Sequence, residues 1–114
     1  MQPVVHRLIT PDETAVLRQA LVRGAIAPVS KSILDTLASL TVVGTCSCGC
    51  RSIYFMAESR EDVRVADTCG TTREGEPIDV MVWVRSGELA ALDLVDYLST
   101  GKLPDPASIG EPRA

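Results

Sequence analysis

The sequence predicts an α+β fold in which two N-terminal helices pack on a four- or five-stranded, mainly antiparallel sheet with a C-terminal hairpin. Three observations predict this fold. Apolar residues recur at helical spacing early in the chain, β-branched and alternating segments follow from residue 41, and a Ser-Gly turn joins the last two segments. A chain of 114 residues that is 46% hydrophobic and 23% charged has the size and composition of one domain, expected to have a core at about 8–103 and loose ends.

The first predicted helix begins after an N-cap residue, Thr10. Thr10 suits the N-cap and Pro11 the first helical position, and Glu13 completes a capping box that satisfies two backbone amides. Apolar residues continue at helical spacing up to Gly24, which suits a left-handed helix stop. We therefore expect a helix at 11–23.

A second, shorter helix is predicted after Pro28. Ser30 or Ser32 can cap it. Four apolar residues would line one of its faces: Ile33, Leu34, Leu37 and Leu40. Because β-branched residues take over from Thr41, the chain is expected to continue as a strand up to the cysteines.

Four more segments complete the predicted sheet. Residues 51–56 and 63–67 resemble strands, and 78–85 alternates so that its Ile and Val residues share one face. Residues 89–97 fit either a strand or a helix. We favour the strand because the turn at 86–88, directly after a strand, is a hairpin signal.

Charge and hydropathy disfavour two classes of partner. The chain carries 11 basic and 15 acidic residues, a net charge of −4, and no stretch concentrates Lys or Arg as nucleic-acid binding requires. Neither a signal-peptide pattern nor an apolar run of about 18 residues is found, which predicts no membrane association and a cytoplasmic location. Cysteines in that compartment stay reduced, so they are expected to be free thiols, metal ligands or redox groups.

Three of the four cysteines lie within the segment Cys46-Ser47-Cys48-Gly49-Cys50, and the fourth is Cys69. In a straight strand the three would point to one face about 6.5–7 Å apart, whereas a tetrahedral zinc ion needs sulfurs about 3.8 Å apart. Gly49 can relieve this mismatch by adopting a positive φ that folds the segment into a turn. Cys48, Cys50 and Cys69 could then converge on zinc as the candidate cofactor, with Cys46 or Asp67 as the fourth ligand.

Two other interpretations of the same cysteines stay open. Cys48 and Cys50 could close a small, strained disulfide that exchanges with other thiols, although the usual Cys-x-x-Cys at a helix N-terminus is missing. Alternatively, the cysteines could be small, buried packing residues, since free cysteine behaves as a small hydrophobe. Structural zinc sites use Cys-x₂-Cys more often than Cys-x-Cys, which weakens the metal interpretation.

The remaining candidates form no catalytic constellation. His6, the sole histidine, has no Ser or Cys motif beside it in the sequence. Trp83 and Met81 lie opposite the Val-rich face of their strand and would form an interaction surface if no helix covers them. The composition therefore favours a non-enzymatic protein-binding or regulatory module of the immunity type, with the cysteine-dependent metal-binding or thiol-redox protein as the alternative.

The order of these segments resembles a group of small bacterial proteins of unknown function. The resemblance runs from about residue 8 to residue 109, and its most specific part is Cys-x-Cys-Gly-Cys-x-Ser at 46–52. Weaker parts are the turn near Gly87 and Leu-Pro-Asp-Pro at 103–106. The resemblance implies one α+β domain with a terminal hairpin, and it implies no activity, cofactor or site residue.

Overall fold

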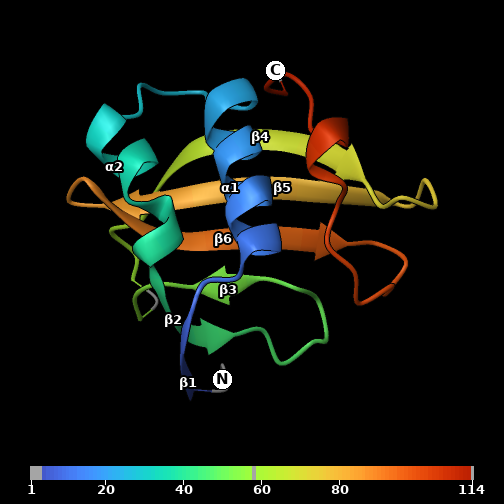
Figure 1. The fold of residues 1–114 in the computed structure, drawn as a ribbon, viewed down its shortest axis with the longest axis horizontal. Coiled ribbons are helices and arrows are strands. Elements are labelled where there is room, and N and C mark those ends of the chain that lie inside the picture. The colour runs from blue at the N-terminus through green and yellow to red at the C-terminus, as the bar shows by residue number, and fades with distance from the viewer. Residues whose placement is uncertain (1–3, 58, 114) are drawn as a thin grey trace.

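The computed structural model describes residues 4–57 and 59–113 and is built on one six-stranded antiparallel sheet (Figure 1). The strands lie in the order β1-β2-β3-β6-β5-β4. Their bounds are β1 (Val4–Leu8), β2 (Thr41–Thr45), β3 (Ile53–Tyr54), β4 (Val63–Thr71), β5 (Pro77–Arg85) and β6 (Glu88–Asp96). The α+β class and the antiparallel sheet are confirmed, but the expected number of four or five strands is wrong.

The additional strand is β1, which pairs with β2. The ladder joins Leu8 to Thr41 and Arg7 to Val42, and an irregularity follows before the Val4–Gly44 pair. Five residues with a partner more than thirty positions away carry no local hairpin signal. The strand therefore depends on tertiary pairing that the sequence pattern does not predict.

Helix α1 (Pro11–Arg23) begins and ends at the predicted residues. The Glu13 amide donates to Thr10 Oγ1 at 3.1 Å and the Thr10 amide donates to Glu13 Oε1 at 3.0 Å, which confirms the capping box. The predicted left-handed stop at Gly24 is wrong, because its φ is −103°. Glycine is required there because a Cβ at this position would lie 2.5 Å from the Thr68 side chain on β4. Since glycine has no Cβ, the end of the helix can pack closely against the sheet.

The expectation of two N-terminal helices packed on the sheet is wrong, because the second one forms only in part. Ser30 caps a short segment as predicted, α2 (Lys31–Asp35), which buries no residue and is followed by the 3₁₀ turn η1 (Leu37–Ser39). Thr36 separates the two, and its φ of −113° ends the α-helical hydrogen bonding. Of the four predicted apolar residues only Leu37 is fully buried, so α1 is the main helix that packs on the sheet.

The core lies between α1 and the sheet. Buried apolar side chains fill it: Val16, Leu17, Ala20, Leu21, Val42, Ile53, Val80, Val82 and Leu92. In Figure 1 all helical segments lie on the same side of the sheet. We call the opposite side the open face, and the strand register assigns to it Tyr54, Asp67, Cys69, Asp79, Met81, Trp83, Ala91, Asp93 and Val95.

The hairpin between β5 and β6 confirms that residues 89–97 contain a strand. Its turn consists of Ser86 with φ 52° and Gly87 with φ 79°. Two successive positive φ angles are typical of the type I′ turn, whose twist matches that of the strands it joins. The turn pairs Val84 with Leu89, and an irregularity between Val84 and Trp83 then shifts the register by one residue, so that Asp93 on β6 lies opposite Met81 on β5.

The C-terminal segment covers the β4 edge of the sheet. The amides of Gly110 and Arg113 donate to the carbonyls of Cys69 and Asp67 at 3.2 and 2.8 Å. Ile109 is completely buried, so the packed part of the chain extends past residue 103, where the sequence placed the end of the core. Such a cover satisfies backbone groups that an exposed edge strand would offer to other chains.

Candidate metal centre

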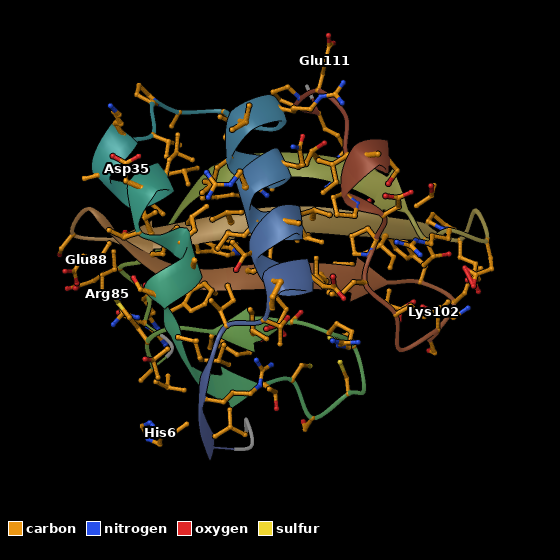
Figure 2. The ribbon with its side chains drawn as sticks, in the orientation of Figure 1. His6, Asp35, Arg85, Glu88, Lys102 and Glu111 are labelled. Carbon is orange, nitrogen blue, oxygen red and sulfur yellow. The ribbon has the colours of Figure 1, made fainter. Side chains whose placement is uncertain are left out.

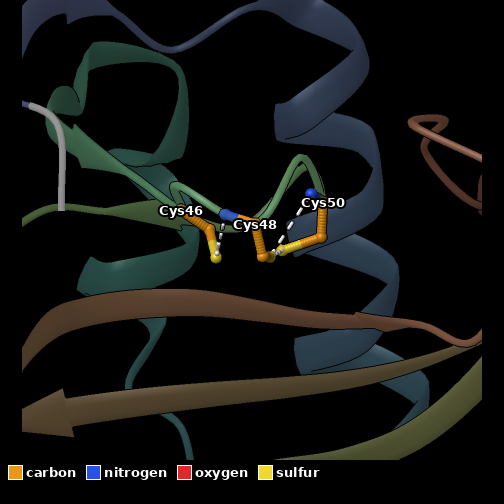
Figure 3. Close-up of side chains that lie close together, drawn as sticks. All are labelled: Cys46, Cys48 and Cys50. Atoms are coloured by element: carbon orange, nitrogen blue, oxygen red, sulfur yellow. Dashed lines mark hydrogen bonds between the residues drawn. The ribbon is translucent and has the colours of Figure 1, made fainter. Parts of the chain in front are cut away.

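The three clustered cysteines form a turn between β2 and β3. We call residues 46–50 the cysteine turn. It is tied to the start of the next strand by the Cys46 amide, which donates to the Ser52 carbonyl at 3.4 Å. Gly49 has a φ of 93°, the positive value that the metal interpretation of the sequence required. The positive φ reverses the chain and turns the three side chains to the same side (Figure 3).

The sulfur atoms of Cys46, Cys48 and Cys50 all lie within 4.8 Å of one another. The sulfurs of Cys48 and Cys50 are hydrogen-bonded at 3.0 Å. The Cys48 amide donates to Cys46 Sγ at 3.4 Å, and the Cys50 amide donates to Cys48 Sγ at 3.5 Å. Sulfurs bound to one zinc ion are about 3.8 Å apart, so small side-chain rotations would bring all three into its coordination shell. The turn is thus close to a three-thiolate metal site.

The structure does not bring Cys69 to this group. Cys69 is exposed on β4, where it pairs with Asp79 of β5. β5 and β6 separate it from the cysteine turn, and adjacent strands are about 4.8 Å apart. Asp67, the other predicted ligand on β4, forms ion pairs with Arg64 at 3.2 Å and Arg113 at 2.5 Å.

Hydrogen bonding within the cysteine turn separates the pKa values of its thiols. The hydrogen bond with Cys48 raises the pKa of Cys46 to about 11, with a further contribution from burial. Hydrogen bonds from Cys46 and Cys50 lower the pKa of Cys48 to about 7. A negative charge on Cys48 is therefore stabilised by its neighbours, which makes it the more readily ionised of the two shifted thiols.

Ser52 connects the cysteine turn to β6. Its side chain is buried, and its hydroxyl accepts hydrogen bonds from the Leu94 amide at 2.8 Å and from Cys50 Sγ at 3.3 Å. The same hydroxyl lies 3.3 Å from Asp93 Oδ1. Sequence reasoning missed this role of Ser52, although the residue belongs to the Cys-x-Cys-Gly-Cys-x-Ser motif, because its partners on β6 are more than forty positions away.

A groove runs beside the three sulfurs. Its lining comes from the cysteine turn, from β6 with Asp93 and Asp96, and from the turn at Ser99, Thr100 and Gly101. The Asp93 carboxylate is linked to Cys50 through the Ser52 hydroxyl, which is hydrogen-bonded to both side chains. The groove therefore leaves room for a further ligand beside a metal ion, either Asp93 after a side-chain rotation or a molecule from solvent.

Trp83 and Met81, the predicted interaction residues, lie half-buried on the open face. The Arg64 guanidinium covers them in part, at 5.9 Å from the Trp83 ring centre and 3.8 Å from Met81 Sδ. Beside Trp83 is a hollow of about 490 Å³ whose lining also includes Tyr54 and Asp93. Trp83 and Met81 are therefore outside the core beneath α1.

Comparison of the chain with models of known protein families, with curated proteins and with solved structures finds no match. The resemblance to small bacterial proteins with a Cys-x-Cys-Gly-Cys-x-Ser motif stays a prediction. None of the described helices combines the length and apolar character that a membrane span requires. His6 is exposed on β1 and projects outward at the edge of the molecule, where it is not a member of the sulfur group (Figure 2).

Proposed function

We propose that the protein binds a thiophilic metal ion, with zinc as the candidate, through the sulfurs of Cys46, Cys48 and Cys50. One observation carries the proposal: three sulfurs from a five-residue turn lie within 4.8 Å of one another. Thiolate sulfur is a preferred ligand of zinc and other soft metal ions. If the cysteines served only as packing residues, they would be buried, but Cys48 is exposed and Cys46 and Cys50 are half-buried.

The surroundings support a site with one open coordination position. Closed structural zinc sites have four protein ligands, whereas the cysteine turn supplies three. The Asp93 carboxylate does not contact the sulfurs directly but is connected to Cys50 through the Ser52 hydroxyl. Ser52 resembles the outer-shell groups that orient metal ligands, because it contacts Cys50 and is itself held by the β6 backbone. A fourth ligand from Asp93, water or a bound molecule would complete the tetrahedron.

The test is elemental analysis with thiol counting on protein purified anaerobically, without a histidine tag or chelator. We expect one equivalent of metal and three masked thiols, with Cys69 reacting freely because it is exposed and remote. Cys48→Ser should lose the metal, and the matched control Cys69→Ser should retain it. Metal-free protein with four freely reacting thiols, even after incubation with zinc, would refute the proposal.

A second candidate function, binding of a protein partner, is favoured by Trp83 and Met81 on the open face. Tryptophan is enriched among residues that dominate binding energy, and here it lies on the open face and borders a hollow. The protein would then act as the non-enzymatic regulatory module of immunity type. Co-purification from the native cell should yield a partner that Trp83→Ala loses and Tyr97→Ala, an exposed aromatic control, retains. Repeated isolation of a monomer without a partner would contradict this function.

A further inference from the structure

We infer that Cys48 and Cys50 form a redox-active dithiol that exchanges with low-molecular-weight disulfides of positive charge. Closing the Cys48–Cys50 disulfide would also dismantle the three-sulfur group. The exchange reaction stands on the geometry of the turn alone, and only its effect on metal binding rests on the proposed function.

The cysteine turn brings the two sulfurs close enough to react. Two residues of extended chain span at most about 7 Å, which exceeds the Cα separation of about 4.4–6.8 Å in most disulfides. The positive φ of Gly49 shortens that span, and the sulfurs of Cys48 and Cys50 lie 3.0 Å apart. A Cβ placed on Gly49 would meet no atom within 4 Å, so the turn has open space in which to adjust as the bond forms.

The surroundings of the two sulfurs assign them different roles. Cys48 is exposed, so a disulfide from solvent can reach its sulfur. Cys50 is half-buried and hydrogen-bonded to Ser52, which is itself buried and held by the Leu94 amide. Cys48 is therefore the attacking residue, and Cys50 is the resolving residue held beside it.

The exchange proceeds in two balanced steps. The Cys48 thiolate attacks one sulfur of the external disulfide, forms a mixed disulfide and expels a thiolate, which takes the proton that Cys48 has lost. Cys50 then loses its proton and attacks Cys48 Sγ, which expels the second external thiol. The protein dithiol is oxidised by two electrons, and the external disulfide is reduced to two thiols.

The charge beside the sulfurs selects the substrate. The groove is lined by the carboxylates of Asp93 and Asp96, and the chain has a net charge of −4. Arg51 is the adjacent residue of opposite charge and is exposed. Two carboxylates against one guanidinium favour a cationic disulfide over an anionic one, and steering of this kind weakens as salt screens the charges.

The product disulfide would be readily reversible. A bond across a single intervening residue deviates from relaxed disulfide geometry, and strained, exposed disulfides are the labile ones. Oxidation would leave Cys46 as the one thiol of the cysteine turn, so a metal bound by three thiolates would lose two ligands. An excess of thiol would restore them.

The test uses reduced, metal-free full-length protein, with cystamine as the cationic probe and dithiodiglycolate as the anionic one. Digestion with trypsin without reduction separates 32–51, which holds the three clustered cysteines, from 65–73, which holds Cys69. We expect 32–51 to lose two hydrogens in mass, with a Cys48–Cys50 bond located by fragmentation. Cystamine should react faster by on the order of tenfold at low salt.

The variants make the outcome decisive. Cys50→Ser should stop at a stable mixed disulfide on Cys48, and Cys69→Ser should behave as the wild type. Circular dichroism of each variant checks that it is folded. The inference is overturned if excess cystamine leaves only mixed disulfides, or if the two probes react equally at low salt.

One further variant separates this inference from the metal site. Cys46→Ser should lose metal binding and keep the exchange reaction, because Cys46 is not part of the dithiol. Exchange without any metal binding in the wild type would refute the proposed function alone. Metal binding without formation of the Cys48–Cys50 bond would refute the exchange alone.

Discussion

The two faces of the sheet differ in burial and in the kind of side chain they carry. Beneath α1, Leu17, Val82 and Leu92 are fully buried and apolar. On the open face, Trp83 and Asp93 are half-buried, and the cysteine turn lies beside the same β6 strand. Apolar burial stabilises the fold on one side, while polar groups and thiols remain accessible on the other. The difference predicts that stability and thiol chemistry respond to separate sets of substitutions.

The largest loss of stability is expected beneath α1. Leu17→Ala would leave a cavity among fully buried side chains and should lower the free energy of unfolding by about 2–5 kcal/mol. Urea unfolding with chelator present measures this change. Zinc bound per folded molecule should be unchanged, since Leu17 lies in the core whereas the groove beside the cysteine turn is lined by residues of β6 and of the turn at 99–101. Loss of metal from a folded Leu17→Ala protein would break the separation of the two faces.

The next largest effect is expected at the start of α1. The Arg7 guanidinium donates two hydrogen bonds of 2.8 Å to the fully buried Glu13 carboxylate. Burial raises the pKa of Glu13, but the hydrogen bonds from Arg7 and Thr10 outweigh it and leave this pKa below its ordinary value. Glu13→Gln should cost about 1–3 kcal/mol of unfolding free energy at neutral pH.

The pH dependence of this contribution follows from the lowered pKa. The stabilisation is complete above the ordinary carboxyl pKa of about 4.3 and is lost as pH falls through the lower pKa of the folded state. Urea unfolding across acidic pH should therefore show the wild type and Glu13→Gln converging as pH falls. Asp12→Asn, at an exposed neighbour, is the control. A constant difference between wild type and Glu13→Gln would contradict the assignment.

An intermediate effect is expected at Ser52, which joins the core strand β6 to the cysteine turn. Ser52→Ala would leave the buried Leu94 amide without its 2.8 Å acceptor and should cost about 1–2 kcal/mol of unfolding free energy. It should also weaken metal binding by about 10- to 100-fold, the usual effect of losing an outer-shell partner. Chelator competition measures the affinity. Ser47→Ala, at an exposed position in the same turn, should change neither the unfolding free energy nor the metal affinity. Equal effects of the two variants would contradict the proposed role of Ser52 as a support of the metal site.

The smallest stability effect, of about 1 kcal/mol, is expected at Gly49. Gly49→Ala meets open space but must adopt a φ of 93°, which disfavours side chains. The alanine should make the cysteine turn open and move the three sulfurs apart. Metal affinity should therefore fall by a larger free energy than the about 1 kcal/mol lost in stability. Gly110→Ala also meets open space without a positive φ, which makes it the matched control in calorimetric unfolding and metal titration. Unchanged metal binding in Gly49→Ala would show that this turn conformation is not needed.

Local features of the chain were predictable from its sequence. The capping box of α1, the alternation in β5 and the hairpin turn at Ser86 and Gly87 each depend on residues a few positions apart. The positive φ of Gly49 belongs to the same class, because glycine alone removes the steric barrier. With these features the sequence determined the main helix and most of the sheet, and Gly49 marked the cysteine segment as one that could fold into a turn.

Only the tertiary structure decided which distant residues meet. β1 pairs with β2, the C-terminal segment covers β4, and Ser52 reaches β6, while Cys69 stays two strands away from the other cysteines. Such contacts depend on strand order and on burial shared by the whole sheet, and no spacing along the chain encodes them. The sequence by itself determined that three thiols lie within five residues around a glycine; the tertiary structure decided that the segment folds into a turn and that Ser52 and Asp93, and not Cys69, lie beside it.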